Sequence, residues 1–151
     1  MPTDDLRSIA DERAIERALV RLARAMDDRD WATLADIIAD DAIGDSGSGR
    51  LEGSAAIIDL IRGYLDSCGP TQHLLGNVLV DVSGEAAVSV AYVHDLHLSA
   101  REPQTTFHTL GDYRDRWERR DGAWRLVERI KRNRATVGSL QVFDASPDHR
   151  T

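Results

Sequence analysis

Cysteine and aromatic residues are scarce in this chain, and it contains no long hydrophobic run. Cys68 is the only cysteine among 151 residues, which excludes an internal disulfide and any zinc site built on paired cysteines. No segment approaches the roughly 20 consecutive apolar residues of a membrane-spanning helix. The acidic amino-terminal segment lacks the basic region and the apolar run of a secretory signal. We therefore expect a cytoplasmic protein with no membrane contact.

Positive charge is also in short supply, with 19 Lys and Arg against 26 Asp and Glu and a formal net charge of −7. A chain of this charge repels nucleic-acid phosphates, despite a local basic run over residues 129–134, so no nucleic-acid partner is expected. The length and the 42% hydrophobic content suit a domain with a core of its own. We predict a single domain over residues 1–143 and a disordered tail over residues 144–151.

Hydrophobic periodicity predicts helices in the first half of the chain. Apolar residues recur every three or four positions over residues 4–28, which is the pattern of an amphipathic helix. Asp30 is typical of a helix N-cap, so a short helix is expected to follow it and to end near Asp40. Ser54 is predicted to cap a third helix that ends before Gly69.

Glycine and alternating hydrophobicity predict the rest of the architecture. The glycine-rich segment 44–49 is expected to be a loop or a hairpin, and it lacks the spacing of a phosphate-binding loop. Beyond residue 70 the period changes from helical to alternating, which predicts a run of long strands. Ser83, Gly84 and Glu85 form the first turn, and Asp121 with Gly122 predicts a tight hairpin before the last strand. Three helices followed by antiparallel strands predict an α+β fold, with helices on one face of a curved sheet that encloses a pocket.

A carboxylate and an imidazole are supplied by two separate apolar elements. Asp27 lies in the last turn of the first predicted helix, where an anion is unfavourable because the helix dipole is negative there. His73 lies at the start of the first long strand. If the fold brings the two together, Asp27 fixes the tautomer of the ring and raises its basicity, which leaves the other nitrogen free for a substrate proton. The plainer interpretations are a surface or capping carboxylate and a structural histidine.

Three further histidines, His94, His97 and His108, lie on predicted strands and raise the question of a metal site. His94 and His97 are an odd number of residues apart, so a regular strand points them to opposite faces. Alternation over residues 86–98 puts His94 with the apolar residues and His97 on the polar face, and a bulge would change this parity. Without a His-x-His pair, we expect no metal.

The more apolar face of the strand predicted over residues 105–120 is expected to line the interior. Its members are Phe107, Thr109, Gly111, Tyr113 and Trp117. Tyr113 places a phenol where it can donate to a carbonyl, or it is an ordinary core tyrosine. Gly111 leaves room for a ligand or marks a bend in the sheet.

Three segments of the chain resemble the SnoaL-like branch of the nuclear transport factor 2-like superfamily. They are Asp27 to Trp31, Thr71 to Gly76 and Tyr113 to Leu126, within a likeness that extends from about Asp11 to Gly138. The enzymes that the chain resembles most are scytalone dehydratase and hexachlorocyclohexane dehydrochlorinase. The resemblance implies three N-terminal helices packed on a strongly curved, mainly antiparallel sheet that forms a cone-like half barrel.

The resemblance also implies functional residues. In both enzymes an Asp at the end of the first helix and a His at the start of the first long strand form the catalytic dyad, and Asp27 and His73 match these positions. His97 resembles a second catalytic histidine of scytalone dehydratase, and Tyr113 falls where that enzyme presents a polar pocket residue. With Trp31, these two residues are our candidates for substrate binding.

The activity that the resemblance implies is an elimination without a cofactor. His73 removes a proton beside a carbonyl or a leaving group, and Asp27 stabilises the imidazolium. We therefore predict a dehydratase-like lyase for a small hydrophobic, cyclic or carbonyl-containing molecule. Met26 replaces a catalytic tyrosine of scytalone dehydratase, which argues against that enzyme's own substrate.

Two alternatives remain open at this point. The first is a polyketide cyclase or ketosteroid-type isomerase that uses the same pocket with Asp27 as the base. The second is a non-catalytic ligand-binding or assembly domain. Because related proteins are commonly dimers or trimers, a homo-oligomer is also expected.

Overall fold

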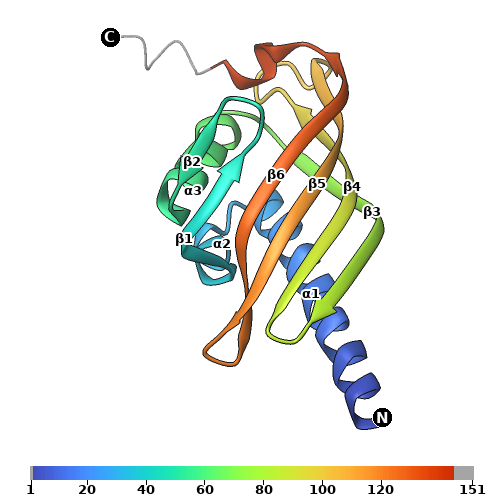
Figure 1. Cartoon of the computed structure of the whole chain (residues 1–151). Helices are drawn as coiled ribbons and strands as arrows, with labels where there is room; N and C mark the ends of the chain where they lie inside the picture. The colour runs from blue at the N-terminus through green and yellow to red at the C-terminus, as the bar shows by residue number, and fades with distance from the viewer. Residues whose placement is uncertain (1, 145–151) are drawn as a thin grey trace.

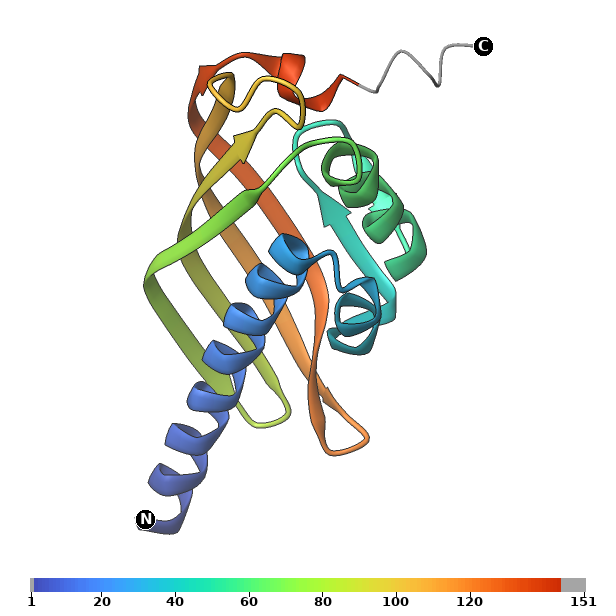
Figure 2. The ribbon, with the colours of Figure 1, turned by 180° about the vertical axis from the view of Figure 1, so that it is seen from behind.

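The protein is an α+β structure in which helices cover one face of a mixed β-sheet (Figures 1 and 2). The computed structural model describes residues 2–144, so the tail predicted over residues 144–151 lies almost wholly outside the described residues. The elements in chain order are α1 (Pro2–Asp28), α2 (Trp31–Ile37), β1 (Ile38–Asp45), β2 (Arg50–Glu52), α3 (Ser54–Leu65), β3 (Thr71–Ser83), β4 (Ala86–Leu98), β5 (Thr106–Arg120), β6 (Ala123–Gly138) and the 3-10 helix η1 (Leu140–Phe143).

The six strands lie in the order β2-β1-β6-β5-β4-β3. Neighbouring strands are antiparallel, except that β1 and β6 pair in parallel. Because β2 and β3 are the two edges of this order, the sheet is open. Asp121 and Gly122 both have positive φ, at 51° and 78°, which is the backbone geometry of the tight turn predicted between β5 and β6. The predicted α+β class and mainly antiparallel sheet are therefore confirmed.

The segment between α2 and α3 differs from the prediction. α2 ends at Ile37 instead of near Asp40, because the chain from Ile38 onward pairs with β6 as β1. The glycine-rich segment then forms the turn of a hairpin to β2, as one of the two predicted options. Gly53, at a φ of 91°, occupies the N-cap of α3, and no side chain caps that helix. The segment around Ile38 is a short apolar run, which fits a helix or a buried strand equally well. Its conformation is therefore decided by pairing with β6.

α1 packs its apolar stripe against the inner face of the sheet, where Ile15, Leu19 and Leu22 are buried. Its first turns extend beyond the sheet (Figure 2), so Leu6 and Ile9 remain exposed. Asp30 caps α2 as predicted, with its carboxylate accepting from the backbone N–H of residue 33. No described helix is both long and apolar enough to cross a bilayer.

The two faces of β4 are the reverse of what hydrophobic alternation indicates. Val88, Val90 and Tyr92 are exposed on the outer face, whereas the inner face buries the intervening smaller or polar residues. These small residues leave room for Trp117, whose indole N–H donates to Ser89 Oγ at 2.9 Å. The apolar side of this strand therefore faces away from α1, and the polar side faces the interior.

A bulge in β3 allows both halves of that strand to face α1. The pairing of β3 with β4 shifts register between Gly76 and Leu79, and Asn77 has a φ of 50°. As a result His73 and Val78, which are an odd number of residues apart, both point to the inner face. The bulge thus places His73 opposite the last turn of α1.

Candidate active site

A cavity of about 510 Å³ lies between the inner face of the sheet, α3 and η1. Apolar side chains of α3 and η1, among them Ile61, Tyr64 and Phe143, form one wall. The opposite wall is polar and consists of inward-facing residues of β3 to β6, namely His73, Asp95, His97, Thr109, Tyr113, Arg129, Lys131 and Asn133. A hollow of this size and lining suits a small molecule with a polar group at one end.

Asp27 and His73 are in direct contact at the edge of this cavity. His73 Nδ1 lies 2.7 Å from Asp27 Oδ1, and the backbone N–H of His73 donates to Asp27 Oδ2 at 3.0 Å. The hydroxyl of Thr71 donates to Asp27 Oδ1 at 3.0 Å. Because the carboxylate accepts from Nδ1, the neutral ring carries its proton there and presents an unprotonated Nε2.

The two members of this dyad differ in their access to the cavity. His73 is one of the lining residues and its side chain is 5% exposed, whereas Asp27 is not among them. Burial opposes ionisation of Asp27, but the hydrogen bonds and charge of His73, with the hydroxyl of Thr71, hold the pKa of Asp27 below its usual value. The geometry therefore gives an ionised carboxylate behind an imidazole that faces the cavity.

Arg29 connects the two elements that carry the dyad, and sequence reasoning did not identify it. Its guanidinium donates to the carbonyl oxygens of Met26 and Asp27 at the end of α1, at 2.8 and 3.2 Å. It also donates to Thr71 Oγ1 at 2.8 Å and to the carbonyl of Gly69 at 2.9 Å, just before β3. An arginine that follows a helix at a φ of 57° gives no signal of such contacts in the sequence.

His97, and not His94, faces the interior, so the alternation argument was wrong on this point. The side chain of His97 is 7% exposed, and Nδ1 lies 3.2 Å from the carbonyl oxygen of Phe107. Burial lowers the pKa of His97 despite the nearby charge of Asp95. His94 instead stacks on His108 on the outer face, with ring centroids 5.4 Å apart. The prediction failed because it equated the apolar face of β4 with the interior.

The sequence analysis missed a buried charged pair in the polar wall. Asp95 on β4 is 1% exposed, and its carboxylate contacts Lys131 Nζ and the hydroxyl of Thr109. The backbone N–H of Thr109 donates to the same carboxylate at 3.0 Å. Burial opposes ionisation, but the charge of Lys131 and these hydrogen bonds together hold the pKa of Asp95 below its usual value. Asp95 shares a strand face with His97, and that spacing is the signal that could have revealed it.

Tyr113 lines the cavity as predicted, and a second ion pair flanks it. The guanidinium of Arg129 lies 3.9 Å from the ring centroid of Tyr113 and donates to both oxygens of Asp115, at 2.9 and 2.7 Å. Burial raises the pKa of Tyr113, so its hydroxyl stays protonated at neutral pH.

The structure does not bring Trp31 to the cavity. Trp31 packs against the hydrophobic core from the first turn of α2, and the guanidinium of Arg62 lies 5.6 Å from its ring. Trp31 is not among the residues that line the cavity. Its predicted contact with substrate therefore has no support in the geometry.

One group of side chains in the described part of the chain has the composition of a metal site. Potential ligand atoms of His73, Asp95 and His97 lie within 4.8 Å of one another. This group differs from the three histidines considered in the sequence analysis, which lie on opposite faces of the sheet. The ammonium of Lys131 already contacts the carboxylate of Asp95, so a divalent cation would have to displace it.

The family of the chain follows from a match to the SnoaL-like domain over residues 7–130. The chain belongs to the SnoaL-like family. This match confirms the predicted SnoaL-like family. A comparison with proteins of curated function found no match.

Several solved structures share the fold over most of the chain. A Novosphingobium aromaticivorans protein provisionally assigned as a scytalone dehydratase is 24% identical, with 100% of this chain and 99% of that chain covered and a TM-score of 0.81. The hexachlorocyclohexane dehydrochlorinase LinA-type3 of Novosphingobium barchaimii is 23% identical, with 95% and 99% covered and a TM-score of 0.79. A Novosphingobium aromaticivorans protein provisionally assigned as an aromatic ring hydroxylase is 22% identical, with 90% and 98% covered and a TM-score of 0.80. One fold thus carries several enzyme assignments, and function has to be argued from the site.

Proposed function

We propose that the protein is a dehydratase-like lyase that catalyses an elimination on a small hydrophobic molecule, with His73 as the base. The observation that carries this proposal is the placement of His73, whose ring faces the cavity while Asp27 holds its Nδ1 from behind at 2.7 Å. The dehydratase and dehydrochlorinase assignments of structural neighbours support the same class of reaction.

The proposed reaction needs one base and one leaving group. His73 Nε2 accepts a proton from carbon, and the electron pair of the broken C–H bond forms the new double bond. The leaving group departs from the neighbouring carbon with its own electron pair, and the imidazolium then protonates it or the solvent. Asp27 stabilises the imidazolium between these two proton transfers, and the apolar wall formed by α3 and η1 limits the access of water.

The position of Asp27 favours this mechanism over direct catalysis by the carboxylate. A cyclase or isomerase that uses Asp27 as its base needs that carboxylate in contact with the substrate. The carboxylate instead lies behind the ring, where it accepts three hydrogen bonds from Thr71 and His73. Cavity access and open hydrogen-bonding capacity both point to the imidazole.

Two single substitutions test the proposal. The wild-type protein is offered cyclic β-hydroxy ketones and chlorinated cycloalkanes, and elimination products are followed by mass spectrometry. We expect His73→Ala to lower kcat by about 10²-fold to 10⁴-fold, the usual contribution of a general base. Asp27→Asn is expected to lower kcat by about 10²-fold or more, because the ring loses its fixed tautomer.

Unfolding curves in urea show whether each variant is folded, and His94→Gln on the outer face is the matched control, expected to keep wild-type turnover. Retained activity in His73→Ala with loss in Asp27→Asn would assign the base to Asp27, as in the isomerase alternative. Unchanged turnover in both variants would end the dyad mechanism, and no turnover of any compound by the wild-type protein would favour a binding or assembly domain.

A further inference from the structure

Lys131 occupies an unusual position in the polar wall of the cavity, since it is a cation held inside the site by other side chains. Its side chain is 17% exposed and its ammonium contacts the carboxylate of Asp95. It also donates to Thr109 Oγ1 at 3.0 Å. An ammonium has three N–H donors, so two are committed and the third has no partner among the described residues. This third donor belongs to a group that lines the cavity.

The other polar groups of this wall are less suited to receive negative charge. Arg129 is already engaged in two hydrogen bonds to Asp115 and lies over the ring of Tyr113. Tyr113 can donate one hydrogen bond but carries no charge. Arg129 keeps three of its five N–H donors, but no contact among the described residues relates it to His73. Lys131 is the cation of the wall that combines an uncommitted donor with a place beside His73, because it contacts the Asp95 oxygen that lies 3.9 Å from His73 Nε2.

Lys131 and His73 lie close together in the polar wall, because both are near the same oxygen of Asp95. His73 Nε2 lies 3.9 Å from Asp95 Oδ2, the oxygen that Lys131 contacts, so the two nitrogen atoms are at most about 7 Å apart. A base approaches the carbon that it deprotonates to about 3 Å, and a donor lies about 2.8 Å from an oxygen that it stabilises. A carbonyl compound bound in the cavity beside Asp95 can therefore present its oxygen to Lys131 and its neighbouring C–H to His73.

We propose that Lys131 binds the carbonyl oxygen of the substrate and stabilises the negative charge that develops there when His73 removes the neighbouring proton. This inference rests on the proposed elimination, and it narrows the substrate to a hydrophobic carbonyl compound with a leaving group on the β-carbon. The C–H electron pair moves to form an enolate, whose oxygen faces the ammonium. The pair then returns to form the C=C bond as the C–X bond breaks, and the leaving group takes the proton that His73 carries. Asp95 and Thr109 are positioning residues that keep Lys131 in place.

The same carboxylate also belongs to the potential metal group of His73, Asp95 and His97. Lys131 supplies positive charge at that carboxylate, and placing a divalent cation beside the ammonium is unfavourable because like charges repel at short range. We therefore assign the electrophilic role to the lysine, and metal dependence is an outcome that the experiment below detects.

The experiment uses a pair of probes that differ in charge and by a single methyl group on the phenol oxygen. We expect wild-type protein to bind para-nitrophenolate about tenfold or more tightly than neutral para-nitroanisole, because one charge-assisted hydrogen bond provides a difference of this order. Lys131→Met is expected to lose this preference while keeping the affinity for para-nitroanisole, and Lys131→Arg, which keeps the charge, should recover part of it. Calorimetric titration at a pH above the pKa of the phenol measures both constants.

Lys131→Met leaves the buried carboxylate of Asp95 without its cationic partner. An unpaired buried charge is costly, so this variant can unfold. The double variant Asp95→Asn with Lys131→Met removes both charges and provides a folded test of the same prediction. A preference for the phenolate that survives in either folded variant would overturn the inference. The inference would also be overturned if the wild-type protein showed no preference for the phenolate, or if Lys131→Met lost affinity for both probes equally. Removal of the preference by EDTA would overturn it as well. Because this titration needs no turnover, its failure is distinguishable from failure of the elimination assay.

Discussion

The guanidinium of Arg29 helps to offset the unfavourable position of the Asp27 carboxylate at the C-terminal end of α1. Asp27 lies in the last turn of α1, where the helix dipole disfavours an anion. Arg29 places a guanidinium at the same helix end and donates to the carbonyl oxygens of Met26 and Asp27. Thr71 and His73 supply three further donors to the carboxylate. The unfavourable position predicted from the sequence is thus offset by contacts from residues that follow the helix.

His97 makes a prediction about pH at the scale of one side chain. Burial lowers the pKa of His97 in the folded protein, so the unfolded chain binds a proton to this imidazole at a higher pH than the folded chain does. The contribution of the neutral His97 side chain to the free energy of unfolding is therefore intact above the ordinary histidine pKa of about 6.5. It decreases as the pH falls below that value. We expect His97→Gln to reduce the loss of unfolding free energy between pH 7 and pH 5.5. Urea denaturation at a series of pH values measures this slope.

His94→Gln is the matched control, since it removes a histidine from the opposite, exposed face of the same strand. We expect this control to keep more of the wild-type slope than His97→Gln does. An identical slope in His97→Gln and in the wild-type protein would show that the buried imidazole does not cause this part of the acid sensitivity.

The junction between β6 and η1 determines how the cavity is covered at one end. Gly138 ends β6 at a φ of 102°, and the N–H of Ser139 donates to the carbonyl of Thr106 at 2.9 Å. The chain then turns into η1, which brings Phe143 against the ring of His97 with centroids 5.0 Å apart. This element was absent from the predictions, because four residues with no apolar period give no helical signal.

Gly138→Ala is expected to destabilise the protein by about 2 kcal/mol or more, because the added Cβ would overlap the carbonyl oxygen of Thr106. The positive φ adds about 1 kcal/mol of backbone strain. Gly47→Ala is the matched control, since Gly47 has a φ of 100° but no atom within 4 Å of the added carbon. Urea denaturation of both variants separates the two effects. Equal losses of unfolding free energy would show that strain alone accounts for the change at Gly138.

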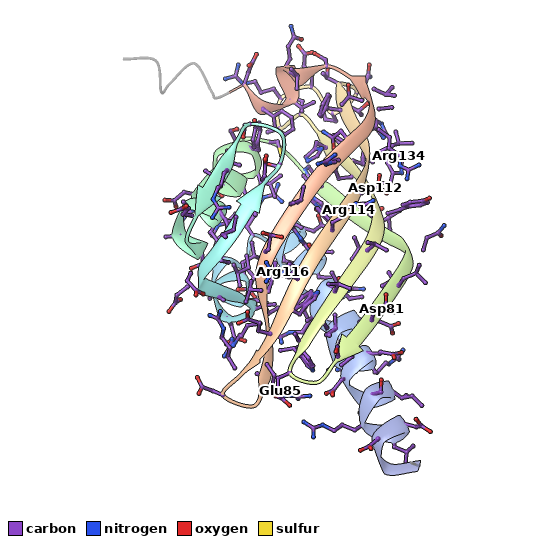
Figure 3. All side chains as sticks on the ribbon, in the orientation of Figure 1. Asp81, Glu85, Asp112, Arg114, Arg116 and Arg134 are labelled. Carbon is purple, nitrogen blue, oxygen red and sulfur yellow. The ribbon has the colours of Figure 1, made fainter. Side chains whose placement is uncertain are left out.

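The outer face of the sheet carries an exposed apolar band, in which the ring of Tyr92 is partly covered by the guanidinium of Arg134. Its exposed members are Leu74, Leu79, Val88, Val90, Tyr92, Leu110 and Val137. Figure 3 labels Arg114 and Arg116 of β5 and Arg134 of β6, which lie on the face of the sheet opposite α1, the face that carries this band. An apolar band with a polar border is typical of a protein interface. The expectation of a homo-oligomer can therefore be placed on this surface.

Leu79→Glu with Val90→Glu tests this expectation, because the two residues are direct partners across β3 and β4 and are 67% and 38% exposed. We expect the double variant to be monomeric while the wild-type protein is a dimer or trimer, since charges buried in an interface are costly. Light scattering after size-exclusion chromatography measures the masses. Ala32→Glu on the exposed side of α2 is the control. A monomeric wild-type protein, or a double variant of unchanged mass, would contradict the prediction.

The sequence by itself determined the features that depend on local spacing. The period of residues 4–28 produces α1, Asp30 caps α2, and Asp121 with Gly122 forms the tight hairpin. The contact between Asp27 and His73 was anticipated from a family resemblance, and its geometry agrees with that expectation. Local hydrogen bonding and side-chain periodicity carry this information, because both act over a few residues.

Only the tertiary structure decided which face of β4 is buried and which charges meet in the cavity. Asp95 and Lys131 are far apart in sequence and belong to strands separated by β5, so no local pattern relates them. The bulge beyond Gly76 and the pairing of β1 with β6 likewise follow from neighbours distant in the chain. Hydrophobic alternation failed at β4 because it assumes that the inner face of a strand is apolar, whereas the inner face of this sheet supplies the polar wall of the cavity.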